Sequence, residues 1–227
     1  RSATPSEMAH AAIPPLNQEQ RRHLLRTMLE SRLGDLREEN LNRQGKGHFH
    51  VSGRGHEALC ALGAQLRAGD YVVPYYRDRG LVMGRGLGTR HLALEYFAKR
   101  ESVSRGRMMP SHFSCRALNI VTVSTPLGAQ LLPACGIAWG LQLDGKDGVV
   151  VTTIGDAATR QGDFYEAVAF AAERKLPVLF IVEDNAYGIS TPTRKTNPLA
   201  LDVLNRTQWR AVDGHDIEAV HAATQEA

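Results

Sequence analysis

Two short apolar runs, joined by an amphipathic segment, constrain the fold of this chain more than any other feature. Residues 149–154 form a mostly β-branched run next to glycines, and residues 177–182 form a second apolar run of the same length. Runs this short predict strands that are buried on both faces. The intervening residues 163–175 predict a helix whose apolar face carries Phe164, Ala167, Val168 and Ala171. A strand, a helix and a strand with short links form a right-handed crossover, so we expect an α/β protein with a parallel sheet and helices on both faces.

The first part of the chain divides into an arm and a long helix. Residues 1–15 are rich in Ala, Pro and Ser without an apolar period, which predicts an extended N-terminal arm. Asn17 is suited to cap the following helix because Gln20 stands three residues later. We expect one buried helix face, formed by Leu24, Leu25, Met28, Leu29, Leu33 and Leu36.

Further helices are expected over residues 57–66, 89–99 and 127–143. The third of these is rich in small residues, which suits close packing or a subunit contact. A last helix begins at Asp216 and the sequence ends within it, so we expect residues 16–227 to be one domain that is truncated at its C-terminus.

Composition narrows the class of partner. The chain has 227 residues, 43% hydrophobic, which is enough for one substantial core. Its net charge is +3 and the basic residues are scattered, which argues against nucleic acid or a membrane as the main partner. No apolar stretch reaches about 18 residues. The three cysteines lack CxxC spacing, which favours a reducing cytoplasm or mitochondrial matrix over a disulfide framework or a zinc site.

Polar residues follow both predicted strands of the crossover. Gly155 and Asp156 end the first strand, and Asp184 and Asn185 end the second. Because parallel strands finish at the same edge of a sheet, we expect these side chains to converge at a ligand site. The oxygens of Asp156 and Asn185, with the backbone carbonyl of Tyr187, are hard ligands suited to Mg²⁺. Gly155 would let a diphosphate approach the backbone.

Other motifs are weaker. Residues 140–146 resemble a phosphate-binding loop, but Asp147 replaces the hydroxyl residue and the segment precedes a strand. The glycines at 84–88 miss the dinucleotide fingerprint, and Cys60 replaces the second histidine of a zinc-protease motif that would begin at His56. His48 and His50 favour structural or surface roles.

The pair of strand ends has a known counterpart. Gly155-Asp156-Ala157, then 26 residues, then Asp184-Asn185 resembles the thiamine diphosphate motif of GDG and NN. Ala157 replaces the third glycine and Asp184 replaces the first asparagine, while both metal-binding positions are retained. The resemblance implies that Gly155, Asp156, Ala157, Ala158, Asn185 and Tyr187 contact thiamine diphosphate or its Mg²⁺.

Five further segments are similar to the α subunit of branched-chain (2-oxoisovalerate) 2-oxo acid dehydrogenases. They are residues 75–78, 106–112, 121–127, 184–191 and 212–216, in the same order. The resemblance implies the thiamine-diphosphate-binding fold and oxidative decarboxylation of a 2-oxo acid, with acyl transfer to a lipoyl group. It also implies a β subunit or domain and a lipoyl-bearing acyltransferase core as partners.

Carried over by position, the resemblance assigns further roles. Tyr76 and Arg77 would contact the diphosphate, and Thr125 and Leu127 would lie beside the cofactor. His112 would be a catalytic histidine near the substrate. A potassium ion is also implied, beside Ser124, Pro126 and Gln130, although Ala129 replaces one of its hydroxyl ligands.

Two alternatives stay open. Glu183 stands where the branched-chain type often has Arg and the pyruvate type often has Glu, so the chain could serve a pyruvate or acetoin dehydrogenase. It could also be a scaffold subunit without turnover, against which Arg77, His112, Asp156 and Asn185 argue.

Overall fold

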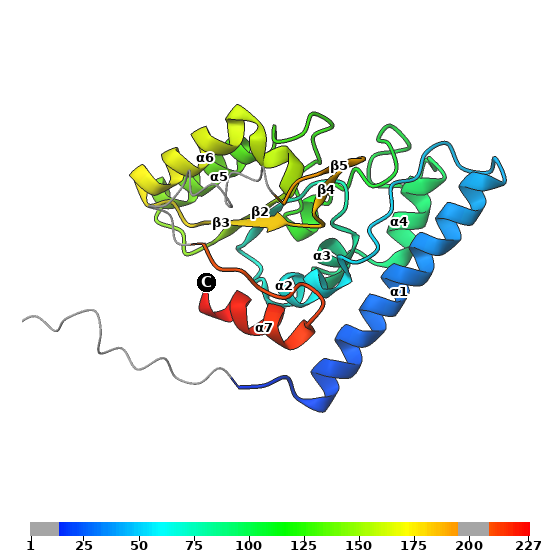
Figure 1. The fold of residues 1–227 in the computed structure, drawn as a ribbon, viewed down its shortest axis with the longest axis horizontal. Coiled ribbons are helices and arrows are strands. Elements are labelled where there is room, and N and C mark those ends of the chain that lie inside the picture. The colour runs from blue at the N-terminus through cyan, green and yellow to red at the C-terminus, as the bar shows by residue number, and fades with distance from the viewer. Residues whose placement is uncertain (1–13, 195–208) are drawn as a thin grey trace, which may run out of the picture.

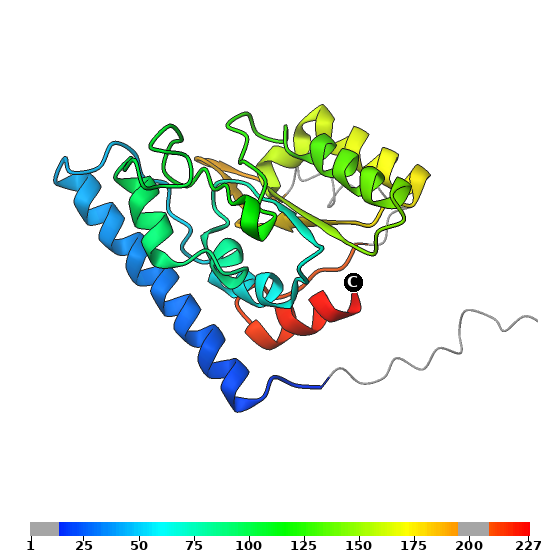
Figure 2. The ribbon, with the colours of Figure 1, turned by 180° about the vertical axis from the view of Figure 1, so that it is seen from behind.

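A parallel sheet lies at the centre of the fold, with helices on both faces (Figures 1 and 2). The computed structural model describes residues 14–194 and 209–227, and in these ranges the sheet has the order β1-β2-β3. Its strands are β1 (Tyr71–Val73), β2 (Val150–Gly155) and β3 (Val178–Glu183). A two-stranded antiparallel hairpin, β4 (Tyr187–Gly188) and β5 (Thr191–Pro192), follows β3.

Helices surround the sheet in chain order. The α-helices are α1 (Gln18–Arg43), α2 (Cys60–Gln65), α3 (Arg79–Gly84), α4 (Thr89–Tyr96), α5 (Leu131–Leu143), α6 (Gly162–Arg174) and α7 (Ile217–Glu226). Short 3₁₀ turns are η1 (Glu57–Leu59), η2 (Arg116–Leu118) and η3 (Asp156–Arg160).

Each face of the sheet has its own apolar core. On one face, Val150 and Ile154 of β2 pack with α5 and α6, including Leu131 and Phe164. On the other face, Val151 packs with residues of α2 and α3. This alternation along β2 follows from the two-residue period of a strand, and it confirms the predicted α/β class with helices on both faces.

The crossover is confirmed with small shifts in its ends. Helix α6 buries Phe164, Ala167, Val168 and Ala171, as its pattern predicts. The prediction that both strands are buried on both faces is wrong for β3, whose first five residues are half-buried. Within the described residues β3 pairs on one side with β2, whereas β2 pairs on both sides, so packing covers β3 less completely.

The prediction of a helix over residues 127–143 is wrong at its start, because α5 begins at Leu131. Residues 127–130 form a turn instead. Gly128 has a φ of +86°, a left-handed conformation that an α-helix does not use. The turn therefore separates the loop at 121–127 from the helix and gives that loop its own position.

The prediction of one buried leucine face on α1 is also wrong. Leu24 is buried, but Leu25, Leu29 and Leu33 are 55%, 51% and 62% exposed. The expected capping box is present, with Asn17 and Gln20 each accepting a backbone N–H from the other. The buried side of the helix is mostly polar and consists of Leu24, Thr27, Ser31, Asp35 and Glu38. It is polar because Asp35 and Glu38 bind the loop at residues 52–54 and Arg79.

The remaining expectations are met in part. Helices α2, α4 and α7 lie where helices are predicted, and Asp216 caps α7 by accepting from the N–H groups of Glu218 and Ala219. The predicted arm lies almost entirely at residues 1–13, outside the described ranges. All three cysteines are free thiols. No helix in the described ranges has the length and apolar character needed to cross a membrane.

Asp70 connects the turn before β1 to the start of β2. Its carboxylate accepts the backbone N–H of Arg67 at 2.6 Å and that of Val149 at 2.9 Å. Burial opposes the charge of Asp70, but these hydrogen bonds and the Arg67 guanidinium outweigh burial and hold its pKa below the ordinary value of 3.8.

We therefore expect Asp70→Asn to lower the free energy of unfolding by about 1–2 kcal/mol at pH 7. Because the folded-state pKa is depressed, this stabilisation is present above the unfolded value and is lost as pH falls through the folded value. Urea denaturation of both proteins at several pH values measures it. A difference that stays constant from pH 7 to the acid limit would contradict the role assigned to the charge.

Candidate functional site

The carboxyl ends of the three parallel strands meet at one edge of the sheet. In the register of the sheet, Val73 of β1 lies beside Thr152, and Gly155 of β2 lies beside Glu183 of β3. The residues that follow are Tyr75 to Arg77 after β1, Asp156 after β2 and Asp184 after β3. The edge predicted to hold the site therefore gathers residues from three segments of the chain.

A buried carboxylate ties the end of β1 to β2. Asp78 is fully buried and accepts the backbone N–H of Tyr75 at 2.8 Å, and the Thr153 hydroxyl also donates to it. The same hydroxyl accepts a hydrogen bond from the Tyr75 N–H at 3.0 Å. Burial and the nearby Glu183 raise the pKa of Asp78 well above its ordinary value. These bonds fix the turn that carries Tyr76 and Arg77.

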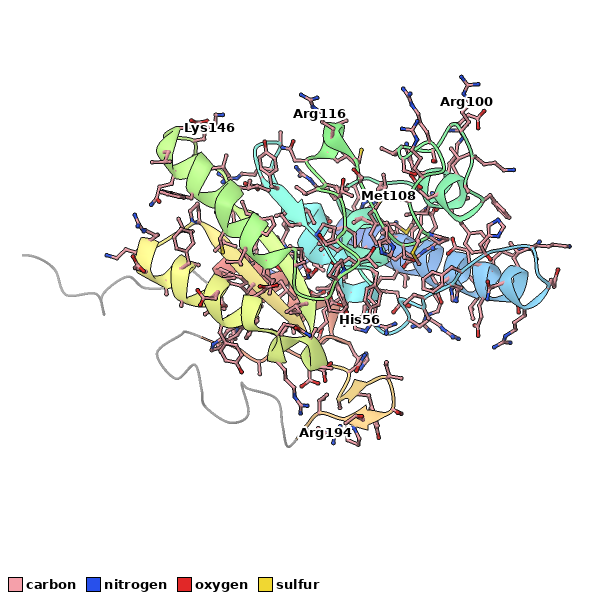
Figure 3. The ribbon with its side chains drawn as sticks, turned by 90° about the horizontal axis from the view of Figure 1, so that it is seen from above. His56, Arg100, Met108, Arg116, Lys146 and Arg194 are labelled. Carbon is pink, nitrogen blue, oxygen red and sulfur yellow. The ribbon has the colours of Figure 1, made fainter. Side chains whose placement is uncertain are left out.

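Glu183 faces the interior of the fold. Its carboxylate contacts His56 Nδ1 and accepts the Tyr75 hydroxyl at 3.2 Å. Burial raises the pKa of Glu183 to about 7, and burial lowers that of His56, helped by the nearby Arg77. His56 lies in the middle of the molecule (Figure 3). The two residues are 127 apart in sequence, so no spacing pattern pointed to this pair.

Asp156 lies where the sequence places it, at the end of β2, and is 2% exposed. The Thr193 hydroxyl donates to its carboxylate. Burial raises the pKa of Asp156, and the neighbouring carboxylate of Asp184 raises it further. A buried carboxylate beside a second one is a fitting place for a cation, because a positive charge would offset both desolvation and repulsion.

Asn185 and Tyr187 lie in the turn after β3. Both are exposed, and the Asn185 side-chain oxygen accepts the Tyr187 backbone N–H at 2.9 Å. The turn approaches Asp156 from β4, since a Cβ added at Gly188 would lie 2.5 Å from the Cβ of Ala157. The structure thus brings the Asp184–Gly188 turn to the β2 end. No contact joins the oxygens of Asp156, Asn185 and Tyr187, so their shared metal site stays a prediction.

Arg77 is the cation that follows β1 at this edge. Its guanidinium lies 5.1 Å from the centre of the Tyr76 ring, and one of its nitrogens donates to the Ser52 carbonyl at 2.6 Å. Both Arg77 and Tyr76 are half-buried. A guanidinium has five N–H donors, so a group held at one nitrogen can still bind a phosphate through others.

The other predicted site residues lie in the loop region before α5. His112 is buried, with Nδ1 3.2 Å from the Pro110 carbonyl and with no hydrogen-bond partner at Nε2 among the described residues. Thr125 and Leu127 are exposed, and Leu127 is 47% exposed. Gln130 donates to the Thr153 carbonyl at 2.7 Å, which attaches this loop to β2. Their roles toward a cofactor remain predictions.

Comparison with known proteins then gives the class. A family model described as "Dehydrogenase E1 component" matches residues 25–227. The chain therefore belongs to the dehydrogenase E1 component family, which confirms the resemblance found from its motifs.

Relatives of two kinds are similar to this chain. The 2-oxoisovalerate dehydrogenase subunit alpha of Bacillus subtilis is 43% identical over 175 residues, which cover 76% of this chain and 53% of the relative. A mitochondrial 2-oxoisovalerate dehydrogenase subunit alpha of Arabidopsis thaliana is 35% identical, covering 82% of this chain and 40% of the relative. The pyruvate dehydrogenase E1 component subunit alpha of Bacillus subtilis is 36% identical, covering 96% and 57%. The chain thus spans about half the length of these relatives.

The hydroxyl of Thr153 gives a test of the site's framework. Thr153→Val preserves shape but leaves Asp78 and the Tyr75 N–H without a buried partner, so we expect a loss of about 1–3 kcal/mol in the free energy of unfolding. Thr152→Val is the matched control, because Thr152 is equally buried and its hydroxyl makes one bond, to the Val73 carbonyl at 3.0 Å. Urea denaturation compares the two. Equal losses would mean that the Asp78 network adds nothing beyond an ordinary strand contact.

Proposed function

We propose that this chain is the cofactor-holding α part of a thiamine-diphosphate-dependent 2-oxo acid dehydrogenase. The observation that carries the proposal is the convergence of Arg77, Asp156 and Asp184 at one sheet edge in a member of the E1 component family. Arg77 supplies a cation for phosphate oxygens, and Asp156 supplies a carboxylate for Mg²⁺. A site with both features is suited to a magnesium diphosphate.

The residues present fit this cofactor. Asp156 and Asn185, with the carbonyl of Tyr187, would hold Mg²⁺ at the end of β2. Tyr76 and Arg77 would bind the diphosphate, and Gly155, Ala157, Ala158, Thr125 and Leu127 would line the cofactor. When bound, thiamine diphosphate accepts the electron pair released as carbon dioxide leaves the 2-oxo acid. The K⁺ site implied at Ser124, Pro126 and Gln130 belongs to the same proposal.

The chain's own residues bind and orient. Asp78 and Thr153 fix the turn after β1, so the Arg77 guanidinium is held in place before a ligand arrives. The unpartnered Nε2 of His112 is available to bind a substrate carboxylate or to move a proton. We assign His112 the catalytic role on this basis.

The partners follow from the relatives. Both kinds of relative are named as α subunits, which supports a β subunit or β domain as the partner of this chain. The acyl group would pass to a lipoyl group on an acyltransferase core. The bacterial and mitochondrial relatives support a bacterial cytoplasm or a mitochondrial matrix as its location.

A branched-chain 2-oxo acid is the favoured substrate, because the 2-oxoisovalerate relative has 43% identity against 36% for the pyruvate relative. Glu183 had suggested pyruvate. Its carboxylate contacts His56 and Tyr75 inside the fold, so its identity is explained by internal packing and carries little information on substrate. Pyruvate remains the second candidate.

Asp156→Ala tests the metal site. Because it removes the buried carboxylate at the end of β2, we expect joint Mg²⁺ and thiamine diphosphate affinity to fall at least about tenfold. Asp144→Ala, at an exposed carboxylate beyond α5, is the matched control and should leave affinity unchanged. Calorimetry on the protein assembled with its β partner gives both values. Equal affinity for Asp156→Ala and the parent would remove the site assignment.

Steady-state rates test the substrate. We expect a higher kcat/KM for 3-methyl-2-oxobutanoate than for pyruvate, and we expect Glu183→Gln to leave the ratio of the two within about twofold, because its side chain faces the interior. A ratio that favours pyruvate would overturn the substrate class while leaving the cofactor site intact. A ratio that changes with Glu183→Gln would show that this position does reach the substrate.

A further inference from the structure

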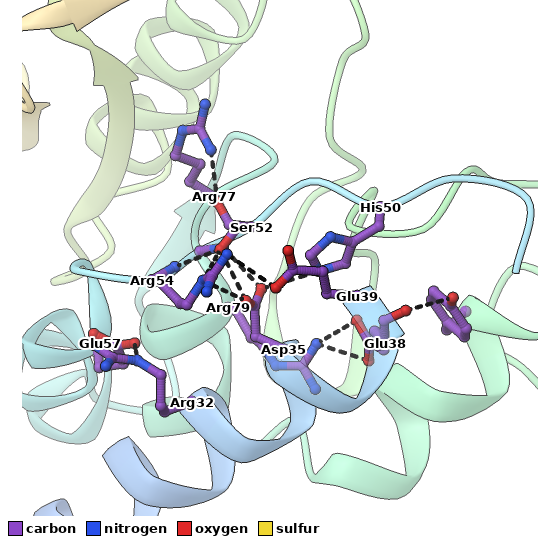
Figure 4. A network of polar contacts seen from close by, with 12 residues as sticks. Arg32, Asp35, Glu38, Glu39, His50, Ser52, Arg54, Glu57, Arg77 and Arg79 are labelled. Atoms are coloured by element: carbon purple, nitrogen blue, oxygen red, sulfur yellow. Dashed lines mark hydrogen bonds and ion pairs between the residues drawn. The ribbon is translucent and has the colours of Figure 1, made fainter. Parts of the chain in front are cut away.

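Helix α1 reaches the candidate site through one buried carboxylate. Asp35 is 2% exposed and lies on the side of α1 that faces the loop at residues 50–54. It accepts the Ser52 hydroxyl at 2.8 Å and the Gly53 backbone N–H at 3.0 Å. His50 and Arg54 lie 3.3 Å and 3.4 Å from its oxygens. Four groups of one short loop thus converge on a single carboxylate (Figure 4).

The same loop holds Arg77. The carbonyl of Ser52 accepts a guanidinium N–H of Arg77 at 2.6 Å. The loop also packs closely on the backbone there, since a Cβ added at Gly53 would lie 3.0 Å from the Arg77 carbonyl oxygen. Any side chain at residue 53 would therefore push the loop away from Arg77. The position of the Arg77 guanidinium depends on where the loop lies, and Asp35 determines where the loop lies.

We propose that Asp35 is a positioning residue for the diphosphate-binding arginine, acting through the Ser52 carbonyl. The inference rests on the proposed function, because it takes Arg77 to bind the cofactor diphosphate. A buried carboxylate that accepts both a backbone N–H and a side-chain hydroxyl holds a loop more rigidly than solvent can. The guanidinium is then oriented before the cofactor binds, which lowers the entropy lost on binding.

This role differs from that of the neighbouring ion pair on α1. Glu38 binds Arg79 with two contacts of 2.8 Å, both to one guanidinium nitrogen, and joins α1 to α3. Arg79 is buried and fits against Gly34, where a Cβ would lie 2.3 Å from its guanidinium. Glu38 therefore fastens the helix to the fold, whereas Asp35 acts on the loop that touches Arg77.

The test is a double-mutant cycle on the full-length protein assembled with its β partner, using thiamine diphosphate and Mg²⁺ as the probe. Asp35→Asn should raise the Kd for thiamine diphosphate about tenfold, with kcat at saturating cofactor changed by less than about twofold. Arg77→Ala should raise the Kd at least as much. The double variant should bind no more weakly than Arg77→Ala alone, because Asp35 acts through Arg77.

Two further variants keep the test decisive. Glu39→Gln is the matched control, because Glu39 lies on the same helix and pairs with Arg54 at 3.0 Å but does not contact Ser52 or Gly53. It should leave the Kd unchanged. Ser52→Ala removes one bond to Asp35 without a change of charge, and it should shift the Kd in the same direction even where Asp35→Asn folds poorly.

The outcomes separate the two proposals. If Arg77→Ala weakens binding but Asp35→Asn and Ser52→Ala do not, the positioning role is overturned and the proposed function stands. Losses that simply add in the double variant would also overturn it, because a general structural effect gives that result. If Arg77→Ala leaves the Kd unchanged, the diphosphate site at this arginine fails, and the inference fails with it.

Discussion

The buried carboxylate of Asp78 is the interaction on which the arrangement of the site depends. It receives a backbone N–H from the turn after β1 and a hydroxyl from the middle of β2, so it fixes one strand end against its neighbour. Parallel pairing alone aligns the strands but leaves the residues beyond them free. With Asp78 in place, Tyr75 reaches Glu183 after β3, and Arg77 is directed toward the loop that contains Ser52.

This framework concentrates charge in a small volume. Glu183 and Asp78 are buried carboxyl groups whose pKa values are raised, and Asp156 is raised as well by burial and by Asp184. Bringing such groups together costs free energy in the absence of a cation. Sites that bind metal ions or charged ligands commonly carry this cost, since the ligand then offsets it. The arrangement is therefore better explained by binding than by stability.

Much of the sheet and its crossover could be predicted from the sequence, because the pattern there is local. Residues 149–182 show a strand period, a helix period and a second strand, and the position of Asp156 at a strand end follows from them. The leucine pattern of α1 misled because a periodic stripe identifies a helix without identifying which side packs. Asp35, as a charged residue, would be assigned to solvent, and only its tertiary partners explain its burial.

The same limit explains the residues that the sequence missed at the site. His56 and Glu183 meet across 127 residues, and Thr193 reaches Asp156 from the hairpin that follows β3. Neither pair has a spacing that a motif could encode, because each depends on the packing of separate elements. The family resemblance supplied roles for Arg77 and His112, but the structure supplied the contacts that orient Arg77.

The central claim is that the end of β2 holds a metal ion that in turn holds a diphosphate. A crystal structure of the complete protein, grown with thiamine diphosphate and with Mn²⁺ in place of Mg²⁺, tests it most directly. The account predicts an anomalous peak within coordination distance of the Asp156 carboxylate, with diphosphate oxygens completing the shell and the Arg77 guanidinium beside them. A diphosphate bound with its metal at any other part of the chain would contradict it.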